Sequence, residues 1–256
     1  MQQSTKTEMV QRKLVRKCGF YERYIKRLLD IICSLMAIVV FGWLYIIVAI
    51  LVRVKLGSPV LFKQPRPGMI DHKTGEETVF DMYKFRTMTD ERDMMGDFLP
   101  DEDRLGKFGK FLRATSLDEL PEVFNILKGD MSIIGPRPQL VRDMVFMTDE
   151  QRMRHTAKPG MSGLAQVRGR NAITWEEKLN WDLKYIEKIS FLVDAKIVFE
   201  TVKVAFIHQE GITDGENATA LDYGDALLKY GKITKEEYDQ KQIEAKRIIA
   251  NQKYRK

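Results

Sequence analysis

The chain has 256 residues, of which 44% are hydrophobic and 30% are charged. A chain of this length and ordinary globular composition can form one compact domain with extensions, and it does not require two independent domains. The formal net charge of +6 predicts an anionic partner. Because no nucleic-acid-binding motif is present and the positive charge gathers beside an apolar segment, we expect anionic lipids and phosphorylated substrates, and no nucleic acid.

Residues 1–29 are predicted to form an amphipathic interfacial helix. Apolar side chains recur at near-helical spacing at Val10, Leu14, Tyr21 and Ile25, and Lys and Arg occupy the remaining face. This pattern is typical of a helix that lies among anionic lipid headgroups. A solvated helix packed on the protein is the alternative.

Residues 30–56 contain an uncharged run of 22 residues, "IICSLMAIVVFGWLYIIVAILV", from Ile31 to Val52. A helix needs about 20 apolar residues to cross a hydrocarbon core of about 30 Å, so this run predicts a membrane segment. It is too long and too far from the N-terminus for the apolar part of a signal peptide, and no small-residue cleavage site follows it. A buried helix of a soluble protein is the alternative. Cys18 and Cys33, one of them inside the run, predict neither a disulfide nor a metal site.

Both ends of the run are basic, and cytoplasmic flanks attract Lys and Arg. A re-entrant hairpin that enters and leaves on the cytoplasmic side satisfies both ends, and a plain span is the alternative. Gly42 is the expected point of bending because glycine weakens a helix interior. The basic flanking residues are Lys6, Arg12, Lys13, Arg16, Lys17, Arg23, Lys26 and Arg27 before the run, and Arg53, Lys55, Lys63 and Arg66 after it.

Residues 57–210 are predicted to form a cytoplasmic domain. The stretches "GSPVLFKQPRPG" and "TVFDMYKFRTM" read as a β-hairpin, and "RLGKFGKFLR" has the apolar spacing of a helix. In "TSLDELPEVF", either Ser116 or Asp118 can cap the next helix, and Pro121 favours Asp118, because position N3 has a free N–H in any case.

Further along, "GMSGLAQVRGR" reads as a short extended piece, "TWEEKLNWDLKYIEKIS" as a helix capped by Thr174, and "VDAKIVFETVKVAFI" as another helix. Residues 211–256 are a polar extension that contains a charged helix capped by Thr234. We therefore expect an α+β protein, mostly helical, embedded in the membrane and carrying a small β-hairpin.

The neighbouring carboxylates Asp118 and Glu119 are the main candidates for chemistry. An Asp-Glu pair at a helix start often serves only to cap the helix. Here Arg86, Arg113 and Arg137 surround the pair in sequence, and guanidinium groups of this kind bind phosphate. An aspartate among them can act as a nucleophile toward phosphorus.

Long motifs make the chain resemble the bacterial sugar transferases, the monotopic polyprenyl-phosphate phosphoglycosyl transferases, over residues 26–210. These motifs are "KRLLDI", "GSPVLFKQPRPG", "YKFRTM", "TSLDELPEVFNILKGDMSIIGPRP", "KPGMSGLAQVRGRNAITWEEK" and "DLKYIEKISFLVDAKI". The resemblance implies transfer of a phosphosugar from a UDP-sugar to undecaprenyl phosphate, on the cytoplasmic face of the bacterial inner membrane. Downstream glycosyltransferases are compatible partners. The family commonly has Ser-Pro at the bend of its membrane hairpin, whereas this chain has Gly42-Trp43, which weakens the expectation of a bend.

By this resemblance Asp118 and Glu119 are the catalytic dyad. Asp118 would form an aspartyl-phosphosugar intermediate with release of UMP, and Glu119 with Asp118 would bind Mg²⁺. Arg86, Arg113 and Arg137 would bind phosphate. A nucleotide or sugar pocket would include Arg168, Arg170, Asn171 and Asp182.

Other polar residues are expected to have no catalytic role. This group includes His72, His155 and His208, because the covalent mechanism needs no histidine. We expect no glycosylation at the sequon of Asn217, because it lies in a tail predicted to be cytoplasmic. The rival hypothesis is a catalytically inactive, membrane-anchored scaffold with the same fold, and a transferase with several spans is disfavoured by the single apolar run.

Overall fold

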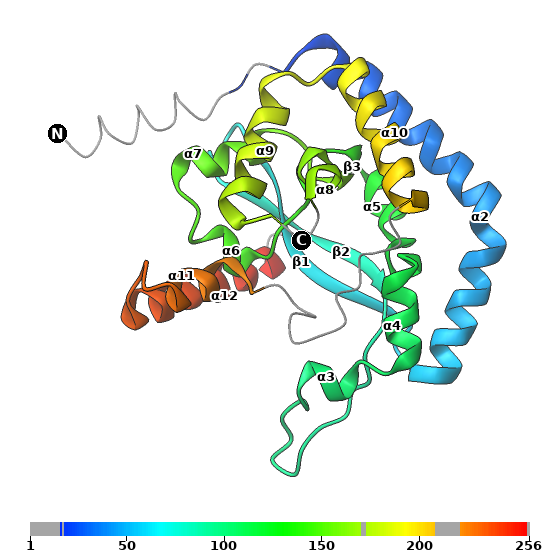
Figure 1. The fold of residues 1–256 in the computed structure, drawn as a ribbon, viewed down its shortest axis with the longest axis vertical. Helices are drawn as coiled ribbons and strands as arrows, with labels where there is room; N and C mark the ends of the chain where they lie inside the picture. Colours follow the sequence, from blue (N-terminus) through cyan, green and yellow to red (C-terminus); the bar gives the residue numbers. More distant parts are fainter. Residues whose placement is uncertain (1–15, 17, 170–172, 208–220, 255–256) are drawn as a thin grey trace. The chain divides into compact units, whose positions relative to one another are not determined.

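The computed structural model describes residues 16, 18–169, 173–207 and 221–254 (Figure 1). The chain separates into two compact units. Unit 1 comprises Met1–Leu29, Pro65–Phe80 and Asp130–Lys256, and unit 2 comprises Asp30–Gln64 and Asp81–Gly129. The four-segment division stays a prediction.

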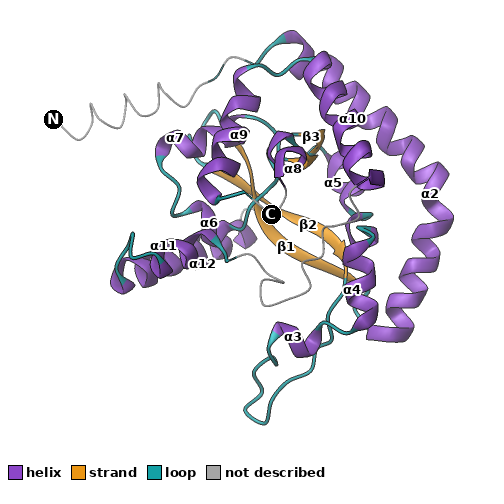
Figure 2. Ribbon diagram, viewed as in Figure 1, coloured by secondary structure: helices purple, strands orange, loops and turns teal. Residues whose placement is uncertain are grey.

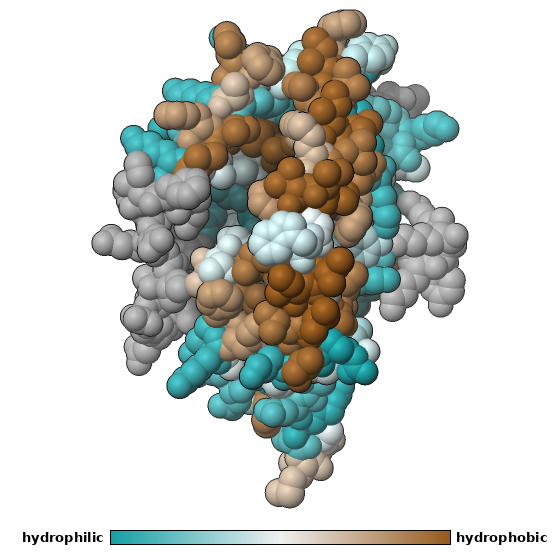
Figure 3. Space-filling view, turned by 90° about the vertical axis from the view of Figure 1, so that its right-hand side faces the viewer, coloured by the Kyte–Doolittle hydropathy of each residue, from teal (hydrophilic) through white to brown (hydrophobic). Residues whose placement is uncertain are grey.

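The long helix α2 (Lys26–Leu56) lies mainly in unit 2 and follows a five-residue π-helical turn, Tyr21–Ile25. Only 11% of its most apolar window is buried, whereas a core helix of a soluble protein would be mostly buried. Figure 3 shows the hydrophobic surface along this helix. The structure is therefore compatible with membrane association and does not favour the buried-helix alternative.

The predicted re-entrant hairpin is not confirmed, because α2 passes through Gly42 without an interruption. Figure 1 shows it as one curved helix rather than two antiparallel segments. The physical reason is that Gly42 alone costs only about 1 kcal/mol, and no proline is present to remove a helical hydrogen bond. At about 1.5 Å per residue, the 31 residues of α2 span about 46 Å, which exceeds the hydrocarbon thickness.

The rest of unit 2 packs on one side of α2. Strands β1 (Leu61–Ile70) and β2 (Glu77–Phe85) form the predicted hairpin, a two-stranded sheet with residues in both units (Figure 2). Three further helices follow β2: α3 (Asp101–Arg104), α4 (Lys107–Ala114) and α5 (Glu122–Lys128). The core of the unit joins Val48 and Val52 of α2 to Phe85 of β2 and Leu112 of α4.

The short strands of unit 1, β3 (Ser132–Ile134) and β4 (Gly160–Ser162), pair in parallel. Helices follow each strand: α6 (Val141–Met144) and α7 (Asp149–Arg152), then α8 (Leu164–Gly169), α9 (Trp175–Glu187) and α10 (Phe191–Ile207). Helices α11 (Tyr223–Lys229) and α12 (Lys235–Tyr254) complete the described chain. One core cluster gathers Ile134, Ala157, Tyr185, Ile186 and Ile197.

Two helix starts confirm the capping predictions. Thr174 and Glu177 form a reciprocal capping box at α9. At the start of α12, Thr234 is the N-cap, and the backbone N–H of Glu237 donates to its hydroxyl at 3.1 Å. The stretch predicted to be extended is only partly so, because Gly160–Ser162 is a strand whereas Leu164–Gly169 is the helix α8.

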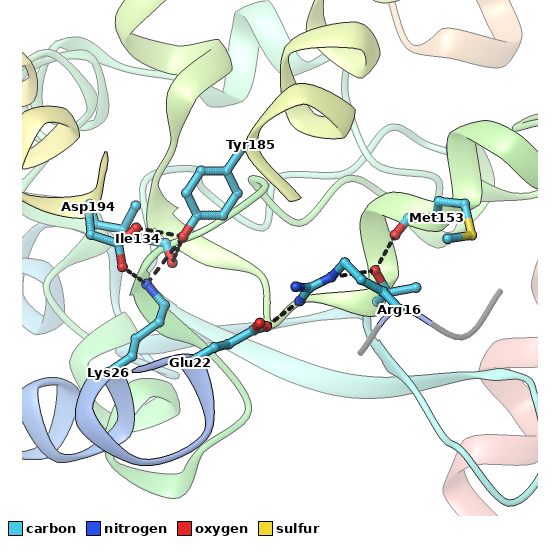
Figure 4. Close-up of polar contacts among 8 residues, drawn as sticks. Arg16, Glu22, Lys26, Ile134, Met153, Tyr185 and Asp194 are labelled. Carbon is cyan, nitrogen blue, oxygen red and sulfur yellow. Dashed lines mark hydrogen bonds and ion pairs between the residues drawn. The ribbon is translucent and has the colours of Figure 1, made fainter. Parts of the chain in front are cut away.

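The first residues of α2 include a buried basic side chain. Lys26, counted among the basic residues that flank the apolar run, is buried and forms an ion pair with Asp194 (Figure 4). The Tyr185 hydroxyl donates to the same carboxylate at 2.8 Å. The predicted amphipathic helix lies largely outside the described residues, and its described end runs directly into α2.

Candidate active site

The candidate nucleophile, Asp118, lies in unit 2. It belongs to a 3₁₀ turn, Leu117–Glu119, that connects α4 to α5. Neither Ser116 nor Asp118 caps α5, which corrects the capping prediction. The helix begins only after Pro121, and no side chain caps it there. Proline fits this position because it has no N–H to leave unsatisfied and its φ is already helical. Ser116 has φ of 55°, a left-handed conformation that turns the chain into the 3₁₀ segment.

The surroundings of Asp118 alter the behaviour of its carboxyl group. Asp118 is 7% exposed, and this burial raises its pKa. The positive charges of Lys84 and Arg113 lower the pKa, and the charge of Glu119 raises it. The carboxylate therefore has little water around it, while cations stabilise its charged form. These are suitable conditions for a nucleophile.

Glu119 contacts a lysine that the sequence interpretation did not single out. Lys84 Nζ lies 2.7 Å from a carboxylate oxygen of Glu119 and 3.4 Å from one of Glu122. Glu122 is 1% exposed. Lys84 lies in the motif "YKFRTM", and Glu122 lies in the motif that begins "TSLDELPEVF". Both residues therefore belong to motifs that were already recognised in the sequence. Their proximity depends on β2 meeting the start of α5, which the sequence does not state.

Arg113 lies on α4, close to this group. Its Nε donates to the Thr87 hydroxyl at 3.1 Å. Helix α4 comes very close to Thr87 at Gly109, where a Cβ would lie 1.9 Å from the Thr87 carbonyl oxygen. Glycine is therefore needed at this position to hold Arg113 beside the turn that carries Asp118.

Arg86, a predicted phosphate ligand, is buried and engaged at the end of α2. Its guanidinium donates to the Ser58 carbonyl at 3.2 Å, to the Leu56 carbonyl and to the Asp90 carboxylate. Its Nε has no hydrogen-bond partner among the described residues. Phosphate binding by Arg86 stays a prediction, and it would require some of these contacts to change.

The remaining predicted residues belong to unit 1. Arg137 follows β3, and its guanidinium donates to the Met161 carbonyl at 3.4 Å. Arg168 lies 3.7 Å from Glu200 in an ion pair. Its guanidinium also sits over the Trp181 ring. Arg170 and Asn171 lie outside the described residues, as does His208.

Asp182 occupies the interior of unit 1. Its carboxylate receives two hydrogen bonds from Arg154, at 2.9 and 2.6 Å, and both side chains are buried. Burial raises the pKa of Asp182, and the charge of Arg154 opposes the rise. The same Arg154 donates to the Arg137 carbonyl at 2.6 Å. Asp182 therefore supports the turn of Arg137 through Arg154.

His155 is buried next to Arg154, and burial lowers its pKa. Its Nδ1 lies 3.1 Å from a carboxylate oxygen of Glu77, which also pairs with Arg152. This enclosed arrangement agrees with the expectation that His155 has a structural role. His72 lies in the β1–β2 connection.

The carboxylates of Asp118 and Glu119 fit a metal ion that takes most of its ligands from substrate and water. Within the described residues, no three His, Cys, Asp or Glu side chains gather as a metal site. Mg²⁺ needs only one or two carboxylates when substrate phosphates and water complete its shell. Asp118 and Glu119 supply that number, although Glu119 is also paired with Lys84.

Comparisons with known proteins identify the family. The family model described as "Bacterial sugar transferase" matches residues 21–208. The uncharacterized sugar transferase EpsL of Bacillus subtilis is 44% identical over 196 residues, which cover 77% of this chain and 94% of EpsL.

Two relatives with named substrates are longer than this chain. The UDP-glucose:undecaprenyl-phosphate glucose-1-phosphate transferase of Klebsiella pneumoniae is 38% identical, over 72% of this chain and 40% of its own length. The UDP-N-acetylgalactosamine-undecaprenyl-phosphate N-acetylgalactosaminephosphotransferase of Aeromonas hydrophila is also 38% identical, over 70% of this chain and 43% of its own length. The matched region thus spans less than half of each of these two relatives. Since the family model covers well over half of the chain, the protein belongs to the bacterial sugar transferase family.

Proposed function

We propose that the protein transfers a phosphosugar from a UDP-sugar to undecaprenyl phosphate through a covalent intermediate on Asp118. The observation that carries this proposal is the buried Asp118 carboxylate beside Glu119, Lys84 and Arg113. The names of the Klebsiella and Aeromonas relatives support the substrate classes. Because those names specify different sugars, the sugar used by this chain is left open.

In the first step, a carboxylate oxygen of Asp118 attacks the sugar-bearing β-phosphorus of the UDP-sugar. A new P–O bond forms, the bond from this phosphorus to the bridging oxygen breaks, and UMP leaves with that electron pair. Lys84 and Arg113 lie where they can offset the negative charge that gathers around Asp118. Arg137 is another proposed phosphate-binding residue.

In the second step, an oxygen of undecaprenyl phosphate attacks the same phosphorus. The aspartyl oxygen leaves, so Asp118 recovers its carboxylate and the product is a polyprenyl diphosphate sugar. Mg²⁺ held by Asp118 and Glu119 would neutralise charge on the diphosphate when bound. No group on the protein needs to gain or lose a proton over the cycle.

Helix α2 and the charges at its ends support a proposal for where the reaction takes place. The exposed apolar surface of α2 would place the protein in the membrane, beside an acceptor lipid that cannot leave it. Arg27 at one end and Arg53 and Lys55 at the other favour the cytoplasmic headgroup layer for both ends. A curved, continuous helix within one leaflet satisfies this charge pattern, so we propose a monotopic protein on the cytoplasmic face.

The proposal is tested by measuring UMP release from the full-length protein in lipid nanodiscs with Mg²⁺ and a panel of UDP-sugars. Without undecaprenyl phosphate, a covalent mechanism gives at most one equivalent of UMP per enzyme and a mass increase equal to one phosphosugar. Adding the acceptor gives turnover. The variant Asp118→Asn should release no UMP in the absence of acceptor and should show no mass increase.

Two results would contradict the proposal. If Asp118→Asn turned over as fast as the original protein, Asp118 would not be the nucleophile. If no UDP-sugar in the panel gave UMP while the protein remained in the membrane, the inactive scaffold would be the better explanation.

A further inference from the structure

Helices α11 and α12 lie beyond the region that matches the family model, which ends at residue 208. They nevertheless pack closely on unit 1. Ala245 of α12 is buried against Val141, Met144 and Val145 of the α6 region. Figure 1 shows α11 and α12 beside α6, in agreement with their contacts. The extension is therefore a folded part of unit 1.

Polar contacts fix the position of α11 on this unit. Asp143, on α6 and 1% exposed, accepts the backbone N–H of Tyr223 at 2.8 Å. The indole N–H of Trp175 donates to the Leu221 carbonyl at 2.8 Å. At Gly224, an added Cβ would lie 2.4 Å from the Phe146 ring, so only glycine allows this close approach. The carboxylate of a buried aspartate thus forms the central polar contact of the docked extension.

Asp143 also connects the extension to the turn that contains Arg137. Helix α6 begins three residues after Pro138. Arg66 donates to the Pro138 carbonyl at 3.0 Å, and its positive charge acts on Asp143. Arg154 donates to the neighbouring Arg137 carbonyl. The carbonyl groups of Arg137 and Pro138 therefore both accept hydrogen bonds from arginine side chains.

The outer surface of α12 favours an intramolecular role over a partner-docking role. Its apolar residues Ala245, Ile248 and Ile249 face unit 1. Lys246 and Arg247 are exposed on the opposite side. The apolar face formed by Ala245, Ile248 and Ile249 is therefore already covered by the α6 region.

We infer that the extension α11–α12 acts as a brace that positions the Arg137 turn, with Asp143 as its positioning residue. This inference rests on the proposed function in one respect, namely that Arg137 binds a phosphate of the UDP-sugar. The brace works by limiting the positions open to α6 and hence to the turn that precedes it. Loss of the brace does not change the residues around Asp118. We therefore expect the loss to weaken substrate binding more than it slows the chemical step.

The test compares three variants of the full-length protein in nanodiscs. Asp143→Ala removes the acceptor for Tyr223, and Asp143→Asn keeps an acceptor oxygen of similar size. The matched control is Ile243→Ala, which changes an exposed residue of the same extension. The measurements are hydrogen exchange of the segment 135–146 and the KM and kcat for UMP release.

We expect Asp143→Ala to speed exchange in 135–146 and to raise KM for the UDP-sugar about tenfold, as for the loss of one charge-assisted hydrogen bond. The kcat value should stay within about twofold, because the reacting carboxylate is unchanged. Asp143→Asn should recover most of the loss, and Ile243→Ala should have no effect. A purely structural role would lower the amount of active protein and hence kcat, without raising KM.

If Asp143→Ala does not unfold but fails to alter exchange in 135–146, the brace is refuted. If exchange rises but KM stays the same, the extension packs on α6 without positioning Arg137. Hydrogen exchange does not depend on catalysis, so failure of the brace can be told from failure of the proposed function. Should Asp143→Ala not fold, Gly224→Leu, which forces α11 away from Phe146, provides the same comparison.

Discussion

Asp118 combines burial with a charge, and this combination links catalysis to stability. A buried aspartate whose folded pKa is raised stabilises the folded state at pH values below its unfolded pKa, and that contribution is lost as the pH rises through the folded pKa. An ionised Asp118 is therefore a cost to folding. Enzymes commonly accept such a cost at a reacting group, which is the role proposed for Asp118.

The first prediction concerns Asp118→Asn at neutral pH. We expect UMP release to fall by at least about a thousandfold, since the proposed nucleophile is lost. The midpoint of thermal unfolding should rise, because the amide carries no charge to desolvate. Thermal unfolding in detergent at pH 7.5 and at pH 4.5 checks this, and the difference between the variant and the original protein should shrink at the lower pH. A lower midpoint for the variant at neutral pH would contradict the electrostatic account.

The second prediction concerns Lys84, which lies between Glu119 and the buried Glu122. Lys84→Met should destabilise the protein by about 3 kcal/mol or more, because it removes a cation that pairs with the buried Glu122 carboxylate. The double variant Lys84→Met/Glu122→Gln should recover most of that loss, because the buried negative charge is then removed as well. Thermal unfolding of the single and double variants measures the coupling. Equal midpoints for the single and double variants would mean that Glu122 finds another cation or water.

The third prediction separates two roles for Asp182. Because its carboxylate is buried against Arg154, Asp182→Asn should lower stability by about 3 kcal/mol or more. In the folded fraction, KM for the UDP-sugar should rise modestly together with the loss of stability, because Arg154 also holds the Arg137 carbonyl. Thermal unfolding and steady-state UMP release together check this. A large rise in KM with unchanged stability would instead support the nucleotide or sugar pocket predicted from the sequence.

At the residue scale, the sequence located the Asp118–Glu119 pair but not the residues around it. The pair stands out because two carboxylates adjoin each other within a long motif. Lys84 precedes Glu119 by 35 positions, and only the folded unit brings the two together. Likewise, the pairing of Asp182 with Arg154 joins residues 28 positions apart, and nothing in the local pattern of "WDLKY" indicates a buried ion pair.

At the element scale, local signals predicted what local interactions decide. The capping boxes of α9 and the alternation in the β1–β2 hairpin depend on neighbouring residues, and both were found where the sequence placed them. The parallel pairing of β3 with β4 and the helix α8 were not predicted. Three-residue strands have too few residues to show alternation, and the glycines around α8 mask its helical pattern.

The fourth prediction belongs to helix α2 as an element. A Cβ at Gly42 would meet no atom within 4 Å, and the helix is continuous there. Gly42→Ala should therefore leave UMP release unchanged and stabilise the helix by about 0.5–1 kcal/mol. Gly42→Pro, which does interrupt a helix, serves as the contrasting variant. A strong loss of activity in Gly42→Ala would show that a sharp bend at this glycine is needed in the membrane.

At the scale of the whole molecule, the sequence could not reveal the division into two units. Units 1 and 2 each take segments from separate parts of the chain, and β1, β2 and α2 have residues in both. Such a division depends on contacts between distant segments rather than on any linker composition.

The fifth prediction concerns the topology of the chain in the membrane. Cysteine probes at Ser4 and Gln240, in a background with Cys18 and Cys33 replaced by Ala, report the side on which each flank of α2 lies. With both flanks on the cytoplasmic face, a membrane-impermeant thiol reagent should label Ser4→Cys and Gln240→Cys in inside-out vesicles but not in intact cells. The basic residues at both ends of α2 are the physical reason, because cytoplasmic anionic lipids attract both.

A helix that crosses the bilayer would give the opposite result for one probe. Ser4→Cys would be labelled in intact cells, while Gln240→Cys would stay protected there. The length of α2 permits either outcome, because about 46 Å of helix is enough to cross a core of about 30 Å. We therefore expect charge at the helix ends, rather than helix length, to decide the topology, and reversing Arg53 and Lys55 to Glu should weaken the cytoplasmic preference of that end.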